Sequence, residues 1–401
     1  MSIQDVLANK IVLLCIAITS LLFASTFLII SVRDHTVLTS TVPSSPPITA
    51  PIHTRDNPSF ESTSSAELGL LAASSSENVL PNAPSPTSTT FATTTQYVVI
   101  AFDGSRSFEM WKQTRDFAKM MEARNAPIHF TYFINTVYLL ASQHRMMYLP
   151  PQHATGTSPI GFAATEREVA DRLERMNGAL NEGHEIGCHM TGHYSGATWS
   201  QKEWEQEFQS FFDIVNNVST INHLEKEPPN RSKLLLPPEG IIGFRAPELG
   251  VNTNLWPALQ KYGLRYDTSL TGKPGTWPAK LPSGLWEFPL QKIPFAGSTT
   301  SSVLSMDYNF YFKQSKAIDN AKRDTPLWSE YYTQVLTSYR DYFEKSYKGN
   351  RAPIYIGHHF SLWNDGVYWD ALKQFAYETC GRPEVKCVTF KEAMQAMSTE
   401  K

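Results

Sequence analysis

The chain has 401 residues, and its 35 Lys+Arg against 38 Asp+Glu give a formal net charge of −3 at pH 7. This length suffices for one large domain or two ordinary ones. The near-balanced charge, without a long basic run, argues against a nucleic-acid partner. Four cysteines without paired Cys-x-x-Cys knuckles exclude a disulfide-dense scaffold and a four-thiolate zinc site of that type.

Residues 11–32 form the first apolar segment, which contains no charge and is bounded by Lys10 and Arg33. That length spans a bilayer. A cleaved signal peptide is the competing interpretation, but its apolar region is shorter and ends in a small-residue cleavage site. We therefore expect a single-pass membrane protein with a short cytoplasmic segment at 1–10. Its C-terminal domain would be extracytoplasmic, at the cell surface or in the periplasm.

Residues 33–95 have a different composition. From 36 to 95 the sequence contains 12 Thr, 12 Ser and 8 Pro. Such a segment cannot bury enough apolar surface to fold. We expect a disordered Ser/Thr/Pro-rich stalk over 33–95, followed by one folded domain over 96–401 that holds every tryptophan of the chain.

The folded part alternates short apolar runs with amphipathic stretches. The predicted helices are 110–124 and 166–182, the second ended by Gly183. The predicted strands are 97–102, 129–134, 185–188, 241–244, 264–266, 353–357 and a run at 388–390. This alternation predicts an α/β fold with a parallel sheet or barrel. In such folds the chemistry lies at the carboxyl ends of the strands.

Reactive side chains follow several of these runs. They are Asp103, the pair His189 and His193, Arg245, Asp267, and His358 with His359. Two histidines four residues apart can bind one metal, and Asp103 can complete a three-ligand site with an open position for water. The sequence lacks HExxH, G-x-S-x-G, G-x-G-x-x-G and P-loop patterns, so we expect neither a serine hydrolase nor a nucleotide cofactor.

Each of these residues also has a purely structural interpretation. The histidine pair can be incidental, Arg245 can precede a surface turn, and Asp267 can cap a helix. Cys380 and Cys387 are close enough in sequence for a local disulfide outside the cytoplasm, or for two reduced thiols in a cytosol.

The order of these motifs resembles the polysaccharide deacetylase family (NodB-type, carbohydrate esterase family four), in its chitin-deacetylase-like branch, over 97–397. Gly-His-Glu-Ile at 183–186 leads to the histidine pair at 189 and 193. Arg-Ala-Pro-Glu-Leu-Gly at 245–250 and Tyr-Asp-Thr-Ser at 266–269 follow. Arg-Ala-Pro at 351–353, before His358 and His359, closes the series.

The resemblance implies a distorted (β/α) barrel of about seven strands. It implies one divalent metal ion, zinc in the first place and cobalt or another ion otherwise, held by Asp103, His189 and His193. The implied reaction is hydrolysis of N-acetyl or O-acetyl groups on a cell-envelope or extracellular polysaccharide.

The resemblance also assigns roles to the other residues. Arg245 would orient the catalytic carboxylate, and Asp267 would tune the late histidine. That histidine would protonate the leaving amine. The distance from the Arg-Ala-Pro string favours His359, and His358 stays an alternative.

The first motif differs from the family pattern T-F-D-D-G, because Ala101-Phe102-Asp103-Gly104-Ser105 has a single carboxylate. Either Asp103 is the base and Gly104 replaces the ligand, or Asp103 is the ligand and the base is missing. Glu248 or Glu109 can compensate. The alternatives to an active deacetylase are a glycan-binding protein without turnover and a structural protein with buried, metal-free histidines. Residues suited to stack on sugar rings are Trp199, Trp256, Trp277, Trp286 and Trp363.

Overall fold

The computed structural model describes residues 94–399. The predicted membrane anchor at 11–32 and nearly all of the predicted stalk lie outside the described residues. Within 94–399, no helix combines the length and the apolar character that crossing a bilayer requires.

Strands and helices alternate through most of the described chain. The strands are β1 (Gln96–Asp103), β2 (Thr131–Ile134), β3 (Glu185–Cys188), β4 (Gly243–Phe244), β5 (Tyr266–Asp267), β6 (Thr271–Gly272), β7 (Ala279–Lys280), β8 (Trp286–Glu287), β9 (Leu290–Pro294), β10 (Ser302–Leu304), β11 (Ile354–His359) and β12 (Val385–Val388). The α-helices are α3 (Phe108–Ala123), α4 (Glu166–Asn181), α5 (Gln201–Ile221), α6 (Pro229–Ser232), α7 (Leu255–Lys261), α8 (Asp307–Ser315), α9 (Pro326–Lys348), α10 (Trp363–Thr379) and α11 (Phe390–Thr399). Four short 3-10 helices complete the fold: η1 (Thr136–Leu139), η2 (Ser142–Met147), η3 (Pro238–Gly240) and η4 (Pro247–Leu249).

The main sheet has nine strands in the order β11-β1-β2-β3-β4-β5-β8-β7, with β12 paired to the first half of β1. Its neighbours are parallel except for β7 and β8. A second sheet has the order β10-β9-β6. The expectation of a mixed α/β fold is confirmed, and the predicted barrel takes the form of a curled, open sheet.

The aromatic ring of Phe390, at the start of α11, shows how strongly the sheet curls. It lies 5.9 Å from Phe133 on β2, 5.5 Å from Tyr266 on β5 and 5.6 Å from Tyr355 on β11. It also lies 5.4 Å from Phe288, which follows β8. Because one ring touches residues from across the sheet, the strands enclose an inner core, and Phe390 fills one end of it.

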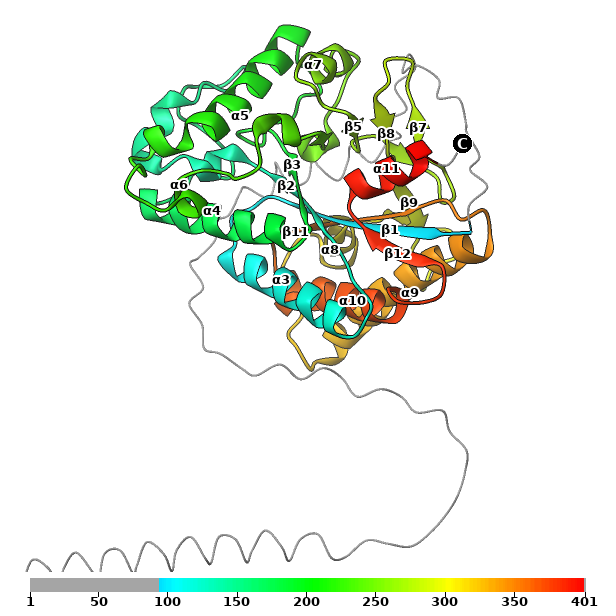
Figure 1. Cartoon of the computed structure of the whole chain (residues 1–401). Coiled ribbons are helices and arrows are strands. Elements are labelled where there is room, and N and C mark those ends of the chain that lie inside the picture. The colour runs from blue at the N-terminus through cyan, green and yellow to red at the C-terminus, as the bar shows by residue number, and fades with distance from the viewer. Residues whose placement is uncertain (1–93, 400–401) are drawn as a thin grey trace, which may run out of the picture. The chain divides into compact units, whose positions relative to one another are not determined.

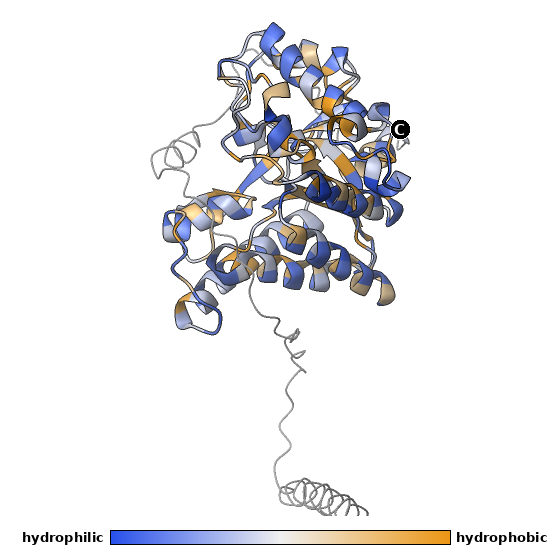
Figure 2. Ribbon diagram, turned by 90° about the vertical axis from the view of Figure 1, so that its left-hand side faces the viewer, coloured by the Kyte–Doolittle hydropathy of each residue, from blue (hydrophilic) through white to orange (hydrophobic). Residues whose placement is uncertain are grey.

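The outer face of the sheet packs against helices. Figure 1 shows α3, α9 and α10 grouped on one side of the molecule and α4, α5 and α6 on another. In Figure 2 the strands near the centre carry the hydrophobic colour, while much of the helical surface is hydrophilic. Each long helix therefore buries one apolar stripe against the sheet.

Local signals set the helix boundaries. The side chains of Ser107, Thr165 and Ser200 accept hydrogen bonds from the first turns of α3, α4 and α5. Beyond the end of α4, Gly183 has φ +86, a left-handed conformation that favours glycine. The predicted strand at 388–390 ends early because a helix-capping pattern begins at Thr389. Thr389 and Glu392 exchange side chain to backbone hydrogen bonds and start α11.

The predicted cysteine pair forms a disulfide. Cys380 and Cys387 have Cα atoms 5.7 Å apart, and their bond joins the end of α10 to β12. It therefore closes the turn that leads the chain into the centre of the sheet. Cys188 is free and buried.

Candidate active site

Five of the predicted residues come together at one edge of the sheet. Asp103 and His359 are the last residues of the neighbouring parallel strands β1 and β11, and their Cα atoms are paired in register. His189 and Arg245 follow β3 and β4, where the backbone N–H of each donates to the preceding strand. His193 follows His189 in the same loop. Parallel strands end at a common edge, so the prediction from strand ends matches the geometry.

Asp103 is held by a buried ion pair. One guanidinium nitrogen of Arg245 donates to Oδ1 of Asp103 at 2.8 Å, and the two side chains are 3% and 0% exposed. The guanidinium also lies 4.7 Å above the ring of Phe133. Gly357 on β11 leaves room for it, since a Cβ there would stand 3.4 Å from the same nitrogen and 2.6 Å from Met306. This carboxylate is fixed in position by a permanent positive charge.

Asp267 lies elsewhere than the motif resemblance implied. Its carboxylate accepts hydrogen bonds from the hydroxyl of Ser269 at 2.6 Å and from the Ser269 backbone N–H at 3.1 Å. Ser269 in turn accepts from the backbone N–H of Ala246 at 2.8 Å. Burial raises the pKa of Asp267, and burial together with the charge of Asp267 raises the pKa of Glu287 beside it. Asp267 therefore supports the loop of Arg245, and the expectation that it tunes the late histidine is corrected.

The partner of the late histidine is Asp307, at the start of α8, which the sequence reasoning missed. Nδ1 of His359 donates to Oδ1 of Asp307 at 2.7 Å, and the His359 backbone N–H donates to Oδ2 at 2.9 Å. Burial works against protonation, yet the charge of Asp307 and this hydrogen bond raise the pKa of His359. The side chain of His359 is 26% exposed, so the imidazole is held by Asp307 on one side and reaches solvent on the other.

His358 points to the other face of β11, as strand alternation requires. It is 1% exposed, lies against Phe102, and its Nε2 is 3.2 Å from the hydroxyl of Tyr339. Burial lowers the pKa of His358 to about 4. Of the two adjacent histidines, His359 therefore faces the strand-end cluster.

His189 and His193 form a close pair, with ring centroids 5.1 Å apart. Nδ1 of His189 hydrogen-bonds the carbonyl oxygen of Arg245 at 2.8 Å. Burial lowers the pKa of both rings, that of His193 to about 3. Met190 and His193 have φ values of 60° and 62°, conformations that are costly outside glycine and cluster at functional sites.

A buried carboxylate on α5 holds the loop between these two histidines. Glu207, which is 0% exposed, accepts from the backbone N–H groups of Thr191 and Gly192, both at 3.0 Å, and from the Tyr148 hydroxyl at 2.9 Å. Burial raises the pKa of Glu207 to about 7. The side-chain amide of Asn135 also donates to the carbonyl of His189. The histidine loop is thus fixed from both sides.

The donor set supports a metal site with two histidines. A histidine ligand commonly hydrogen-bonds a backbone carbonyl through its other nitrogen, as His189 does. The ligand atoms of Asp103, His189 and His193 do not all lie within 4.8 Å of one another, and Asp103 is engaged by Arg245. Between the two roles left open for Asp103, this geometry favours the base. Gly104, with φ +83 and open space at its Cβ position, stands where a second carboxylate is expected.

The two carboxylates considered as substitutes differ in position. Glu248 is exposed, with φ 57, and its charge contributes, after burial, to raising the pKa of Tyr308. The Tyr308 ring lies 6.1 Å from His359, so this tyrosine borders the site. Glu109 is on α3 and accepts from Gln113 at 2.8 Å.

The tryptophans considered for sugar binding differ in burial and in their distance from the site. Trp199, Trp277 and Trp286 are buried in the core. Trp363 lies 5.3 Å from His359 and stacks on Tyr311 at 4.9 Å with an interplanar angle of 9°. An aromatic surface therefore borders the imidazole of His359.

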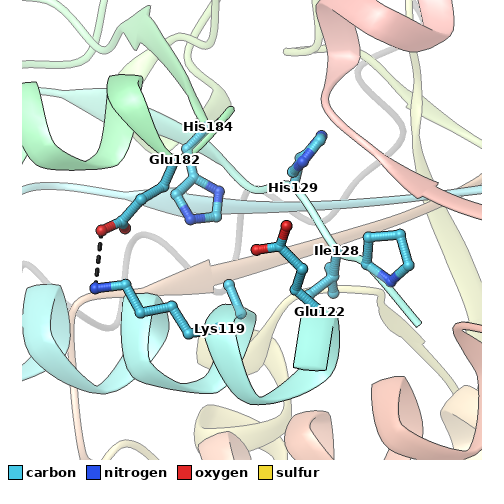
Figure 3. A pocket seen from close by; sticks show the side chains of 8 residues that line it. Lys119, Glu122, Ile128, His129, Glu182 and His184 are labelled. Carbon is cyan, nitrogen blue, oxygen red and sulfur yellow. Dashed lines mark ion pairs between the residues drawn. The ribbon is translucent and has the colours of Figure 1, made fainter. Parts of the chain in front are cut away.

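A small cavity lies at the opposite end of the strands. Figure 3 shows its lining from α3 and from the segments before β2 and β3, including His129, His184 and the ion pair of Lys119 with Glu182 at 2.8 Å. Its volume is about 30 Å³. None of the predicted site residues lines it, and it is too small for a sugar ring.

Comparisons with known proteins gave the following findings. No family model matches the sequence, and no curated protein matches it. Among solved structures, a protein assigned as a polysaccharide deacetylase from Mycobacterium smegmatis is 13% identical with a TM-score of 0.47, over 79% of this chain and 96% of that one. A family 4 carbohydrate esterase from Streptomyces lividans is 11% identical with a TM-score of 0.36, over 72% and 90%. A family 4 pseudoenzyme from Bacillus anthracis is 9% identical with a TM-score of 0.37, over 74% and 65%. These structures are of the family that the sequence motifs resemble.

Proposed function

We propose that this protein is a hydrolase that removes acetyl groups from a polysaccharide. One observation carries the proposal: Asp103 and His359 end neighbouring strands in register, and each is fixed by an opposite charge. A carboxylate held by Arg245 and an imidazole held by Asp307 are a base and an acid placed side by side. This is the pair of groups that hydrolysis of an amide or ester needs.

On the base side, the Asp103 carboxylate accepts a proton from the attacking water. Arg245 occupies one of its oxygens, which leaves the other to receive the proton. The buried ion pair fixes the direction of that oxygen, so little reorganisation is needed during the reaction.

On the acid side, His359 donates a proton to the leaving nitrogen or oxygen as the tetrahedral intermediate collapses. The raised pKa of His359 keeps the donor protonated closer to neutral pH than a free imidazole. Since Nδ1 is bound to Asp307, Nε2 is the nitrogen that faces the substrate. Asp307 takes no proton itself and acts as a positioning residue.

His189 and His193 would hold a divalent metal ion, zinc in the first place and cobalt or another ion otherwise. When bound, such an ion lowers the pKa of its water and polarises an acyl carbonyl. Their low pKa values keep both imidazoles neutral and able to bind a cation.

Glycan binding without turnover is the second candidate, favoured by Gly104. With one carboxylate in the first motif and that one paired to Arg245, the metal position lacks a third side-chain ligand. Gly104→Asp discriminates between the two functions, because nothing lies within 4 Å of the added Cβ. The left-handed φ of +83 costs this variant roughly 1–2 kcal/mol.

For the substrate we propose an N-acetylated or O-acetylated polysaccharide of the cell envelope or the extracellular space. The support is the partly exposed indole of Trp363, 5.3 Å from His359, because sugar rings stack on such faces. We also propose that residues 11–32 anchor the chain in a membrane with the C-terminal domain outside the cytoplasm. The disulfide of Cys380 and Cys387 supports an oxidising compartment.

The test is acetate release by the full chain from acetylated chitin, peptidoglycan and xylan fragments. Wild-type protein should release acetate, and Asp103→Asn and His359→Gln should each be slower by roughly 10²- to 10⁴-fold. Asp341→Asn, at an exposed position on α9, is the matched control. If the wild-type protein binds the same fragments without releasing acetate, and Gly104→Asp does release acetate, the second candidate, glycan binding without turnover, would be supported instead.

A further inference from the structure

A second group of metal-ligating side chains lies outside the strand-end cluster. His144 on η2, Glu166 at the start of α4 and His223 after α5 bring one ligand atom each within 4.8 Å of the others. Oε1 of Glu166 is 2.7 Å from Nε2 of His144 and 2.7 Å from Nδ1 of His223. We propose that these three residues form a zinc site, distinct from the candidate active site.

The backbone beside the three ligands is held by buried hydrogen bonds. Asn222, which is 0% exposed, accepts from the backbone N–H of Ala141 at 2.9 Å and donates to the carbonyl of Leu139 at 2.9 Å. The Ser142 backbone N–H donates to Ala163 at 2.8 Å, close to the start of α4. These bonds tie together the three segments that carry the ligands. The side-chain amide of Gln143 donates to Oε1 of Glu166 at 2.7 Å and lies 3.1 Å from Nε2 of His144, so it is the group that an entering ion would displace.

The backbone conformation of His223 directs its imidazole toward Glu166. It has φ 51, a left-handed conformation that a non-glycine residue adopts at a cost. The side chain is 67% exposed, yet its Nδ1 reaches a carboxylate that is 28% exposed. His223 directly follows the C-cap of α5, and the Leu224 backbone N–H donates to the Ser219 carbonyl at 2.9 Å, so this conformation is the usual end of a helix and sets the direction of the imidazole toward Glu166.

The chemistry of the donors selects the class of ion. Two imidazoles and one carboxylate suit zinc, whereas magnesium and calcium prefer all-oxygen sites. Zinc takes such ligands at about 2.0–2.2 Å. The 2.7 Å contacts between the ligand atoms would widen as the ion enters. Each ring nitrogen that binds must carry no proton, so the proton of each neutral ring moves to its other nitrogen.

Two further features determine how the site should bind zinc. Three protein ligands leave a fourth position for water. The positive end of the α4 dipole opposes a cation there, so we expect reversible binding rather than permanent occupancy. A bound ion would join three segments far apart in sequence and should raise the unfolding temperature.

The experiment is a zinc titration of the full chain by calorimetry, with thermal unfolding in the presence and absence of zinc. The variants are His223→Asn, because asparagine tolerates a left-handed conformation, and Glu166→Gln. His153→Ala removes an exposed histidine outside the group as the matched control. All proteins also carry His189→Ala, which separates this site from the strand-end cluster.

In that background the control should bind one zinc per chain and show a higher unfolding temperature with zinc. Losing even an outer partner of a ligand costs roughly 10- to 100-fold in metal affinity, so His223→Asn and Glu166→Gln should lose at least that much. Magnesium should cause no shift. Equal zinc affinity and an equal rise of the unfolding temperature in control and variants would overturn the proposal, as would no binding in the control.

Discussion

The pairing of His359 with Asp307 can be tested by Asp307→Asn. The variant keeps the size of the side chain and removes its charge, while burial of His359 stays. Two unit charges about 4 Å apart interact by roughly 4 kcal/mol at an effective dielectric constant near 20. Burial of the imidazole opposes this interaction in the wild type, so removing the charge leaves burial to set the direction of the pKa change.

The direction in which the pKa of His359 should change follows from the two effects that act on it, the charge of Asp307 and burial. In the wild type, Asp307 outweighs burial, and the pKa of His359 lies above 6.5. Without that charge burial dominates, so the pKa should fall below 6.5. The wild-type pair contributes stability that is complete below the unfolded pKa of histidine and is lost as the pH rises through the folded pKa. That contribution should be absent in Asp307→Asn.

The measurement is an NMR titration of histidine-labelled full-length protein, with the His359 signal assigned from His359→Gln. It does not depend on catalytic activity. Asp341→Asn, an exposed position on α9, is the matched control and should leave the titration unchanged. A His359 that titrates at or above 6.5 in Asp307→Asn would refute the reasoning.

Three further predictions concern stability. Glu207→Ala should lower the free energy of unfolding by about 2–5 kcal/mol, because it orphans two buried N–H groups; urea unfolding measures this, and Glu207→Gln should recover most of it. Glu287→Gln should stabilise the protein more at pH 8 than at pH 5, because a carboxyl with a raised folded pKa loses its contribution as the pH rises above its unfolded value. Replacing both Cys380 and Cys387 by serine should cost about 2–3 kcal/mol in urea unfolding for this short loop.

A specific result would contradict each of these three stability predictions. Equal loss in Glu207→Ala and Glu207→Gln would show that the carboxamide cannot replace the bonds to the histidine loop. The same stabilisation by Glu287→Gln at both pH values would mean that the pair with Asp267 holds no raised pKa. Unchanged unfolding of the double serine variant under oxidising conditions would show that the disulfide contributes nothing to stability.

Much of the site could be predicted because parallel strands end together. Once Asp103, His189, Arg245 and His359 were placed at strand ends, the sheet itself brought them to one edge. Alternation along β11 then decides between the two adjacent histidines, since only one can share the face of Asp103.

The rest could not be predicted, for reasons that differ by residue. Asp307 follows a strand of three residues and lies 52 positions before His359, so no local pattern links them. Glu207 occupies an inward position of an amphipathic helix that periodicity would assign to an apolar residue. Asp267 ends a strand like the others, yet Ser269 satisfies its carboxylate locally.

The proposed function divides the strand-end cluster into a histidine pair that would hold a metal and a carboxylate, Asp103, that would act as the base. Elemental analysis of the full chain tests this division most directly, in a His223→Asn background that removes the second proposed site. We expect one divalent ion per chain after incubation with zinc, lost in His189→Ala and retained in Asp103→Asn. Loss of the ion in Asp103→Asn would make Asp103 a ligand, and no ion in the parent protein would contradict a metal-dependent hydrolase.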